Sequence, residues 1–309
     1  MAPARPAAPP RVVVSGAGGL VGAALVPALA AAGHGVVRLV RRAPRGPDEI
    51  PWDPERGSLD PRALEGCDAV VHLAGAPLAV RWTAARRRAI RESRVAGTRL
   101  LAQRLAALER PPRVLVSASA MGIYGDRGDT VLTEESAPGS GFLADLCRAW
   151  EEAAKPAAAR GIRVVHPRTA LVLAPRGGAL ARLLPPFRLG LGGRVGRPGA
   201  WWSWIALDDL LAALRFALEE ERLRGPFNAA SPQPVTGAEF ARTLARVLRR
   251  PALLPVPAAA LRLAFGVMAE ETLLASVRLA PARLAAAGFA FRFPALEDAL
   301  RHVLGGVRC

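Results

Sequence analysis

A glycine-rich segment near the start of the chain constrains the fold more than any other feature. It reads Ser15-Gly16-Ala17-Gly18-Gly19-Leu20-Val21-Gly22, between an apolar run that ends at Val14 and an Ala- and Leu-rich stretch at 23–32. In a dinucleotide-binding turn with this glycine spacing, a Cβ would obstruct the tight turn, the pyrophosphate or the packing of helix against strand. The segment predicts such a loop, with a purely structural strand-to-helix turn as the alternative.

The helix after this loop would present its N-terminus to the cofactor phosphates. The first backbone N–H groups of a helix have no partner within it, and the helix dipole places partial positive charge there. The expected cofactor contacts are therefore Gly16, Gly18, Gly19, Leu20, Val21 and Gly22. Gly19 is expected to be the least replaceable of them, because a side chain there would occupy the space of the pyrophosphate.

Strand-like and helix-like segments alternate along most of the chain. Strands are expected at 12–14, 36–40, 69–73, 113–116 and 163–165, and helices at 20–32, 83–108, about 142–160 and 207–221. This alternation predicts an α/β fold with a doubly wound, Rossmann-type parallel sheet. A smaller, mainly helical C-terminal lobe is expected on the substrate side. The predicted parts are a disordered tail at 1–10, an NADP-binding domain at 11–235 with a substrate-side loop at about 176–204, and the lobe at 236–305.

Composition narrows the range of partners. The three cysteines are scattered without metal-ligand spacing, which predicts a reducing cytoplasm and no metal site. The net charge of +16 is also typical of nucleic-acid-binding proteins, but the arginines are spread out without interleaved aromatic residues, so no nucleic-acid partner is expected. No apolar run reaches the roughly 18 residues of a membrane helix, and no membrane partner is expected. The expected partner is a small-molecule substrate, and a homodimer is compatible with the sequence.

The end of the second expected strand indicates which dinucleotide is bound. An acidic residue at this point binds the ribose hydroxyl of NAD, whereas an arginine accommodates the 2′-phosphate of NADP. Here Arg41 and Arg42 follow the strand, with no acidic residue before Asp48. Because a guanidinium can bind a phosphate through two hydrogen bonds, the expected cofactor is NADP(H). The alternative is two surface arginines in an arginine-rich chain.

The expected strand at 69–73 is followed by small residues. Leu73, Ala74 and Gly75 are expected to contact the cofactor, which would pass over the carboxyl end of this strand. His72 is interpreted as a packed, hydrogen-bonded strand residue and not as a catalyst.

Several downstream motifs occur in the order typical of one group of proteins. They are Glu92-Ser93-Arg94, the run from Ser117 to Gly125, the run from Pro186 to Gly193, Trp204-Ile205 with Asp208-Asp209, and the segment at 251–257. With the glycine loop, they resemble the extended (atypical) short-chain dehydrogenase/reductase superfamily. The match is to its epimerase-like subfamily of cell-division-inhibitor homologues, which has its own C-terminal domain of unknown function. The resemblance implies an NADP-binding fold and adds Arg94, Ser117 and Arg168 to the expected cofactor-binding residues.

The superfamily's chemistry rests on a tyrosine and a lysine one helical turn later, and this chain lacks that pair. Tyr124 is its only tyrosine and lies far in sequence from its only lysine, Lys155. Alignment on Glu151 places Leu143 where the tyrosine would be and Cys147 where the lysine would be.

The superfamily's serine is matched by Ser119, so Ser119 and Tyr124 are the candidate catalytic residues. The first function predicted is an NADP(H)-binding epimerase or oxidoreductase that acts on a small polar substrate. Tyr124, Ser119 or a bound water would handle the proton in place of the missing pair. If Tyr124 donates it while Ser119 orients a carbonyl oxygen, turnover should rise toward alkaline pH, because a phenol has a reference pKa of about 10. Alternatively, both residues are packed and hydrogen-bonded. In that case the protein would bind the dinucleotide without catalysis, in a regulatory or partner-binding role.

Overall fold

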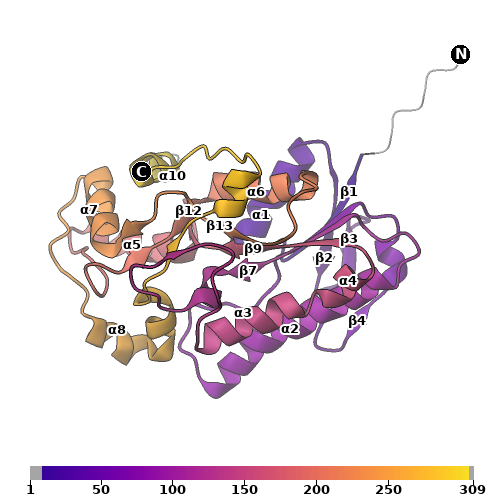
Figure 1. Ribbon diagram of the computed structural model, residues 1–309, viewed down its shortest axis with the longest axis horizontal. Coiled ribbons are helices and arrows are strands. Elements are labelled where there is room, and N and C mark those ends of the chain that lie inside the picture. Colours follow the sequence, from indigo (N-terminus) through magenta and orange to yellow (C-terminus); the bar gives the residue numbers. More distant parts are fainter. Residues whose placement is uncertain (1–8, 306–309) are drawn as a thin grey trace, which may run out of the picture.

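The computed structural model describes residues 9–305, which form a wide sheet with helices on both faces and a second cluster of helices beyond one end (Figure 1). Residues 1–8 of the predicted tail lie outside the described part of the chain. No helix within 9–305 combines the length and the apolar character needed to cross a bilayer.

The main sheet has the strand order β13-β9-β6-β5-β1-β2-β3-β4, with β7 also paired to β9. Its strands are β1 (Arg11–Ser15), β2 (Gly35–Val40), β3 (Glu49–Asp53), β4 (Ser58–Leu59), β5 (Ala69–His72), β6 (Val114–Ser117), β7 (Ser119–Ala120), β9 (Arg163–Thr169) and β13 (Gly225–Ala229). All pairings are parallel except that of β3 with β4. The predicted doubly wound parallel sheet is confirmed. The strand order reverses beside β1, so the carboxyl ends of β1 and β5 border the crevice where ligands bind in such sheets.

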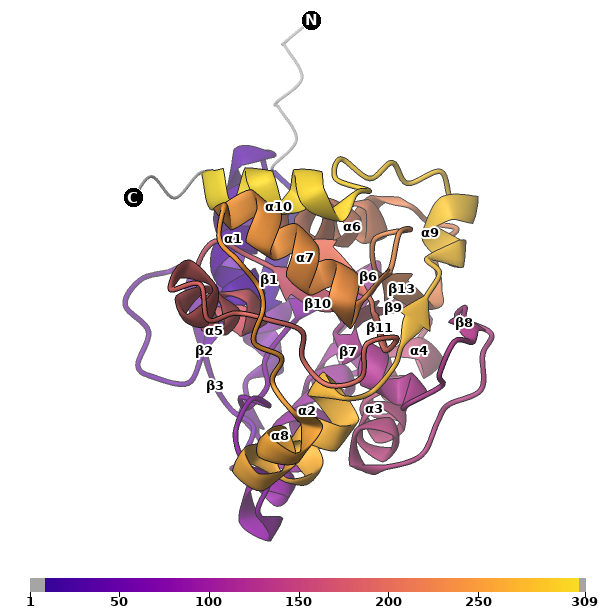
Figure 2. The ribbon, with the colours of Figure 1, turned by 90° about the vertical axis from the view of Figure 1, so that its left-hand side faces the viewer.

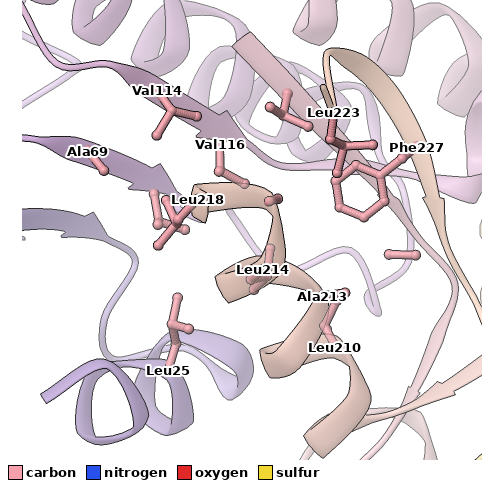
Figure 3. Packing of buried hydrophobic residues seen from close by; sticks show 14 of the residues in the cluster. Leu25, Ala69, Val114, Val116, Leu210, Ala213, Leu214, Leu218, Leu223 and Phe227 are labelled. Carbon is pink, nitrogen blue, oxygen red and sulfur yellow. The ribbon is translucent and has the colours of Figure 1, made fainter. Parts of the chain in front are cut away.

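Helices cover both faces of this sheet. One face carries α1 (Leu20–Ala31) and α6 (Leu207–Glu219), and the other carries α2 (Ala84–Ala106) and α4 (Lys155–Ala159), with α3 (Phe142–Glu152) beside α2. Val12 and Val14 pack into the first core and Val13 into the second. Burial on both faces explains the uninterrupted apolar sequence of β1. Figure 3 shows the first core, where Leu214 of α6 lies among residues of the strands and of α1.

The helical lobe predicted at the C-terminus has a hydrophobic core of its own. It contains β10 (Leu171–Leu173), α5 (Gly178–Arg188), β12 (Trp204–Ala206), α7 (Gly237–Leu248) and α10 (Leu296–Gly305). Figure 2 shows α7 alongside α10. Leu184 and Trp204, from the predicted NADP-binding domain, share this core with Leu244 and Leu300. Segments before and after residue 235 therefore build the lobe together.

The smaller elements complete the fold. They are η1 (Pro61–Leu64), η2 (Met121–Tyr124), β8 (Val131–Leu132), β11 (Trp201–Trp202), β14 (Val235–Thr236), α8 (Ala258–Phe265), η3 (Ala269–Leu273), β15 (Arg278–Leu279) and α9 (Ala282–Ala286).

Part of the loop predicted at 176–204 is helical. The two prolines of α5, Pro185 and Pro186, suggest a break because each removes a helical hydrogen bond. In the structure both prolines are exposed, so water can solvate the carbonyl groups left without partners. Leu184 and Phe187 are buried in the lobe, and their packing stabilises the helix.

Candidate functional site

The glycine loop joins β1 to α1 at the carboxyl edge of the sheet. Gly16 has a φ of +72°, and a Cβ there would lie 2.7 Å from the carbonyl carbon of Leu73. A Cβ on Gly22 would overlap the carbonyl oxygen of Gly16. By contrast, a Cβ on Gly19 would meet one atom, the Gly16 oxygen at 3.3 Å, and a Cβ on Gly18 would have no neighbour within 4 Å. For folding, Gly16 and Gly22 are therefore less replaceable than Gly19, whereas the expectation for Gly19 concerns cofactor binding and stays a prediction.

The N-terminus of α1 is suited to an anionic group. Its N-cap residue, Gly19, provides no side-chain hydrogen bond, and the first turn contains no acidic residue. Leu20 and Val21 are partly exposed, and Gly18 is exposed. The backbone N–H groups of the first turn are thus open to a ligand, and the helix dipole favours negative charge there. These features fit the pyrophosphate of a dinucleotide.

Ser15 connects the glycine loop to the end of β5 through hydrogen bonds. Its hydroxyl oxygen accepts hydrogen bonds from the backbone N–H groups of Leu73 (3.2 Å) and Ala74 (3.3 Å) and lies 2.6 Å from Nδ1 of His72. His72 is fully buried, and burial lowers the pKa of its imidazole to about 4. This confirms the interpretation of His72 as a packed strand residue. Leu73 and Ala74 are partly exposed and Gly75 is exposed, so the segment after β5 is accessible beside the glycine loop.

The two arginines after β2 have different surroundings. Arg42 donates two hydrogen bonds to the carboxylate of Glu49, at 2.8 and 2.7 Å. These hydrogen bonds are the main reason that the pKa of Glu49 is lowered to about 2. Arg41 is exposed, and its side chain forms no hydrogen bond or ion pair with the residues in 9–305. Arg42 is therefore hydrogen-bonded within the protein, and its predicted cofactor contact stays a prediction, whereas Arg41 is the residue whose side chain is available to a ligand.

Arg168 lies inside the protein, not at the cofactor crevice. Its Nε and Nη2 donate to the two carboxylate oxygens of Glu151 (2.9 and 3.0 Å). Its Nη1 donates to the hydroxyl of Tyr124 (2.9 Å) and to the carbonyl of Glu134 (3.3 Å). Because each nitrogen of the guanidinium already has an acceptor, the structure does not support the predicted cofactor contact. Arg168 instead holds the end of β9 against α3 and η2.

Tyr124 and Ser119 belong to the same buried network. The Tyr124 side chain is fully buried, and its hydroxyl donates to Oδ1 of Asn228 (2.7 Å) while accepting from Arg168. Burial raises the pKa of this phenol despite the nearby guanidinium. Ser119 is 3% exposed and donates to Glu151 at 2.6 Å. Tyr124 therefore does not face the crevice as a proton donor would, and its surroundings fit the packed alternative.

Ser117, another expected cofactor contact, also lies below the surface. Ser117 is fully buried at the end of β6, where its hydroxyl has no hydrogen-bond partner among residues 9–305. Its backbone carbonyl lies 3.2 Å from Nδ1 of His166. A direct side-chain contact with a cofactor is therefore not supported.

The positions of the missing tyrosine and lysine lie in the first half of α3. Leu143 is 6% exposed and Cys147 is 1% exposed. Burial is the main reason that the pKa of the Cys147 thiol is raised to about 12, so this position is uncharged at neutral pH. Neither side chain can replace the ionisable pair.

The C-terminal lobe contributes a residue that sequence reasoning missed. The carboxylate of Glu271, in η3, accepts hydrogen bonds from the backbone N–H groups of Phe142 (3.0 Å) and Leu143 (2.7 Å). These are the first residues of α3, whose N-cap, Gly141, has no side chain to cap the helix. Glu271 thus fixes the helix of the site from far away in the sequence, where no local pattern could indicate the contact.

The reversal of strand order beside β1, the glycine loop and the uncapped helix define the class of dinucleotide-binding α/β proteins. More specifically, the chain belongs to the NAD dependent epimerase/dehydratase family, which it matches over residues 12–230. Residues 256–303 match a domain of unknown function, DUF1731. These matches confirm the resemblance to the short-chain dehydrogenase/reductase superfamily. Within residues 9–305, no group of three or more His, Cys, Asp or Glu side chains is arranged to hold a metal ion.

The chain is similar to family members from distant organisms over nearly its whole length. It is 44% identical to epimerase family protein Mb2239 of Mycobacterium bovis, over 94% of this chain and 96% of that one. Human epimerase family protein SDR39U1 is 37% identical, over 95% of this chain and 99% of the human protein. A crystal structure of human SDR39U1 (isoform 2) with NADPH has a TM-score of 0.87 at 33% identity, covering 96% of this chain and all of that one.

Proposed function

We propose that this chain binds NADP(H) at the carboxyl edge of its main sheet. The observation that carries the proposal is the uncapped N-terminus of α1 beside the open space at Gly18 and Gly19. Residues 16–22 would hold the pyrophosphate, residues 73–75 would border the cofactor, and Arg41 would bind the 2′-phosphate. The related human protein has been crystallised with NADPH, which supports the choice of nucleotide.

The proposed activity is that of an oxidoreductase or epimerase acting on a small polar substrate. When bound, NADP(H) supplies the hydride donor or acceptor, and the chain has to bind the substrate and orient its oxygen atom. Ser119 is the hydroxyl that we propose for this orientation; its proton is now donated to Glu151, and it would have to turn from that carboxylate to donate to a substrate oxygen. The buried free thiols of Cys67 and Cys147 support a reducing compartment such as the cytoplasm.

A second function, dinucleotide binding without catalysis, is favoured by a specific observation. The hydrogen-bonding groups of Tyr124 and Arg168 are occupied inside the protein, and Leu143 and Cys147 cannot act as an ionisable pair. A protein of this kind would use the bound nucleotide in regulation or in partner binding.

The two functions are separated by following the nicotinamide absorbance when NADPH is mixed with a panel of small carbonyl compounds. Consumption by the wild type that is lost in Ser119→Ala would support the enzyme. Tight NADPH binding by the wild type without consumption of any compound on the panel would favour the non-catalytic function.

The variant Arg41→Asp is expected to lose most of the preference for NADP(H) over NAD(H). A charge-assisted hydrogen bond contributes about 1.5–3 kcal/mol, so NADPH affinity should fall roughly 10- to 100-fold while NADH affinity changes little. Calorimetric titration of both cofactors measures this. Arg56→Asp makes the same charge change at a highly exposed position and should leave the preference intact. Equal wild-type affinities for the two cofactors would refute the assignment of NADP(H).

The variant Tyr124→Phe is expected to lower the free energy of unfolding by about 1–3 kcal/mol, because Asn228 and Arg168 each lose a buried partner. NADPH affinity and any turnover should stay close to the wild-type values. Urea unfolding and NADPH titration measure the two quantities. A variant of unchanged stability that no longer consumes NADPH would restore the catalytic role of Tyr124.

A further inference from the structure

Exposed leucines are concentrated on two segments of the lobe. Of the seven large apolar side chains that are exposed within residues 9–305, six lie in 189–191 and 253–267. They are 48% to 80% exposed, and they are Leu189, Leu191, Leu253, Leu254, Leu263 and Val267. A single exposed leucine is ordinary on a protein surface, whereas several together indicate a surface that another molecule covers.

The two segments lie side by side, which brings four of these leucines close together. Leu191 is paired with Ala252 in an antiparallel bridge, and the backbone N–H of Leu254 donates to the carbonyl of Gly192 (3.2 Å). Figure 2 shows the second segment running from the end of α7 past α5 to α8, a helix in which no residue is buried. We call the four leucines the leucine cluster; they are Leu189, Leu191, Leu253 and Leu254.

The chain around the leucine cluster is basic. No Asp or Glu occurs in 153–207 or in 240–269, the stretches that contain the two segments. Arg188, Arg249 and Arg250 flank the leucines in the sequence; all three are exposed, and none forms an ion pair within residues 9–305. The chain as a whole has a net charge of +16. A partner that matches this surface is therefore apolar and negatively charged.

A lipid bilayer matches both properties better than a second copy of the chain does. Two copies would bring the same unpaired arginines together, and like charges across an interface are unfavourable. Leu189, Leu253 and Leu263 are 73% to 80% exposed, so their side chains project into solvent. Projecting aliphatic side chains can enter the boundary between headgroups and acyl chains, while neighbouring arginines stay at the level of the phosphates. Such contact needs no membrane-spanning helix.

We propose that the leucine cluster and α8 dock this protein on the surface of a phospholipid bilayer that contains anionic lipids. The leucines enter the headgroup boundary, and Arg188, Arg249 and Arg250 bind lipid phosphates. The proposal goes beyond nucleotide binding and does not depend on it, since none of these residues belongs to the proposed cofactor site.

Sedimentation with lipid vesicles tests the apolar part of this surface. The wild type should bind vesicles of phosphatidylcholine mixed with phosphatidylglycerol, bind phosphatidylcholine alone much more weakly, and be released as the salt concentration rises. The double variant Leu253→Ser with Leu254→Ser should bind the mixed vesicles about tenfold more weakly or worse, because less apolar surface is buried. Val131→Ser, at the one exposed large apolar residue outside the two segments, is the control and should bind as the wild type does.

A second pair of variants tests the charge. Arg249→Gln with Arg250→Gln should bind the mixed vesicles about 10- to 30-fold more weakly, since each arginine near an anionic surface contributes roughly fivefold. The matched control is Arg86→Gln with Arg87→Gln, an exposed pair on α2 away from the leucine cluster, and it should change binding little. All of the substituted side chains are exposed, so every variant should keep the Tm of the wild type.

Three results would overturn the proposal. The first is a wild type that does not bind the mixed vesicles, or binds phosphatidylcholine alone equally well. The second is undiminished binding by the leucine variant, which would show adsorption by charge alone. The third is a wild type that is dimeric in analytical ultracentrifugation and becomes monomeric in the leucine variant, since a second copy would then cover the cluster. NADPH titration is independent of all three, so the proposed function stands or fails separately.

Discussion

Replacing Gly19 with valine is expected to abolish NADP(H) binding while leaving a folded protein. Gly19 has φ −81° and ψ 173°, an extended conformation that valine adopts readily. A Cβ there would lie 3.3 Å from one backbone oxygen, a contact that a small shift can relieve. The rest of the side chain would project at the N-terminus of α1, where the pyrophosphate is proposed to bind. The steric conflict is therefore with the ligand and not with the fold.

The measurements are NADPH titration and thermal unfolding of the free protein. Gly22→Ala is the matched control, because its Cβ would overlap the Gly16 carbonyl oxygen, and it should lower the Tm of the free protein. Gly19→Val should keep a Tm close to that of the wild type. Tight NADPH binding by Gly19→Val would show that the loop is only a turn between strand and helix.

Removing the carboxylate of Glu151 is expected to cause the largest loss of stability. In Glu151→Ala the buried guanidinium of Arg168 loses both of its carboxylate hydrogen bonds, and Ser119 loses its acceptor. Breaking a buried ion pair by removing one partner typically costs about 3–5 kcal/mol, since the remaining charge is uncompensated. We expect a loss of this size in the free energy of unfolding, measured by urea denaturation.

The adjacent residue provides the control for this variant. Glu152 has a side chain 59% exposed and pairs with Lys155 at the surface, so Glu152→Ala should change the stability by less than about 0.5 kcal/mol. The double variant Glu151→Leu with Arg168→Met replaces the charged pair by apolar side chains and should be more stable than Glu151→Ala. Equal effects of Glu151→Ala and Glu152→Ala would contradict the importance of the buried pair.

The sheet and the cofactor loop were largely predictable because their signals are local. An apolar run such as that of β1 indicates a strand buried on both faces, and the glycine spacing after it indicates the turn into a helix. The elements that were missed or misread have weak local signals. β3 contains Pro51 and is defined by its pairing with β2, and α5 contains two prolines on its exposed face.

The sequence by itself determined the fold class, the family resemblance, the cofactor loop and the absence of the tyrosine–lysine pair. Each of these depends on residues close together in the chain or on which residue types are present. Only the tertiary structure decided which polar side chains are available to a ligand. The guanidinium of Arg42 donates hydrogen bonds to Glu49, and that of Arg168 donates to Glu151 inside the protein. By contrast, Arg41 is exposed, and Arg94 has no acidic partner within residues 9–305. Whether an arginine has a carboxylate beside it depends on how separate strands and helices pack together, which the spacing of residues in the sequence does not show.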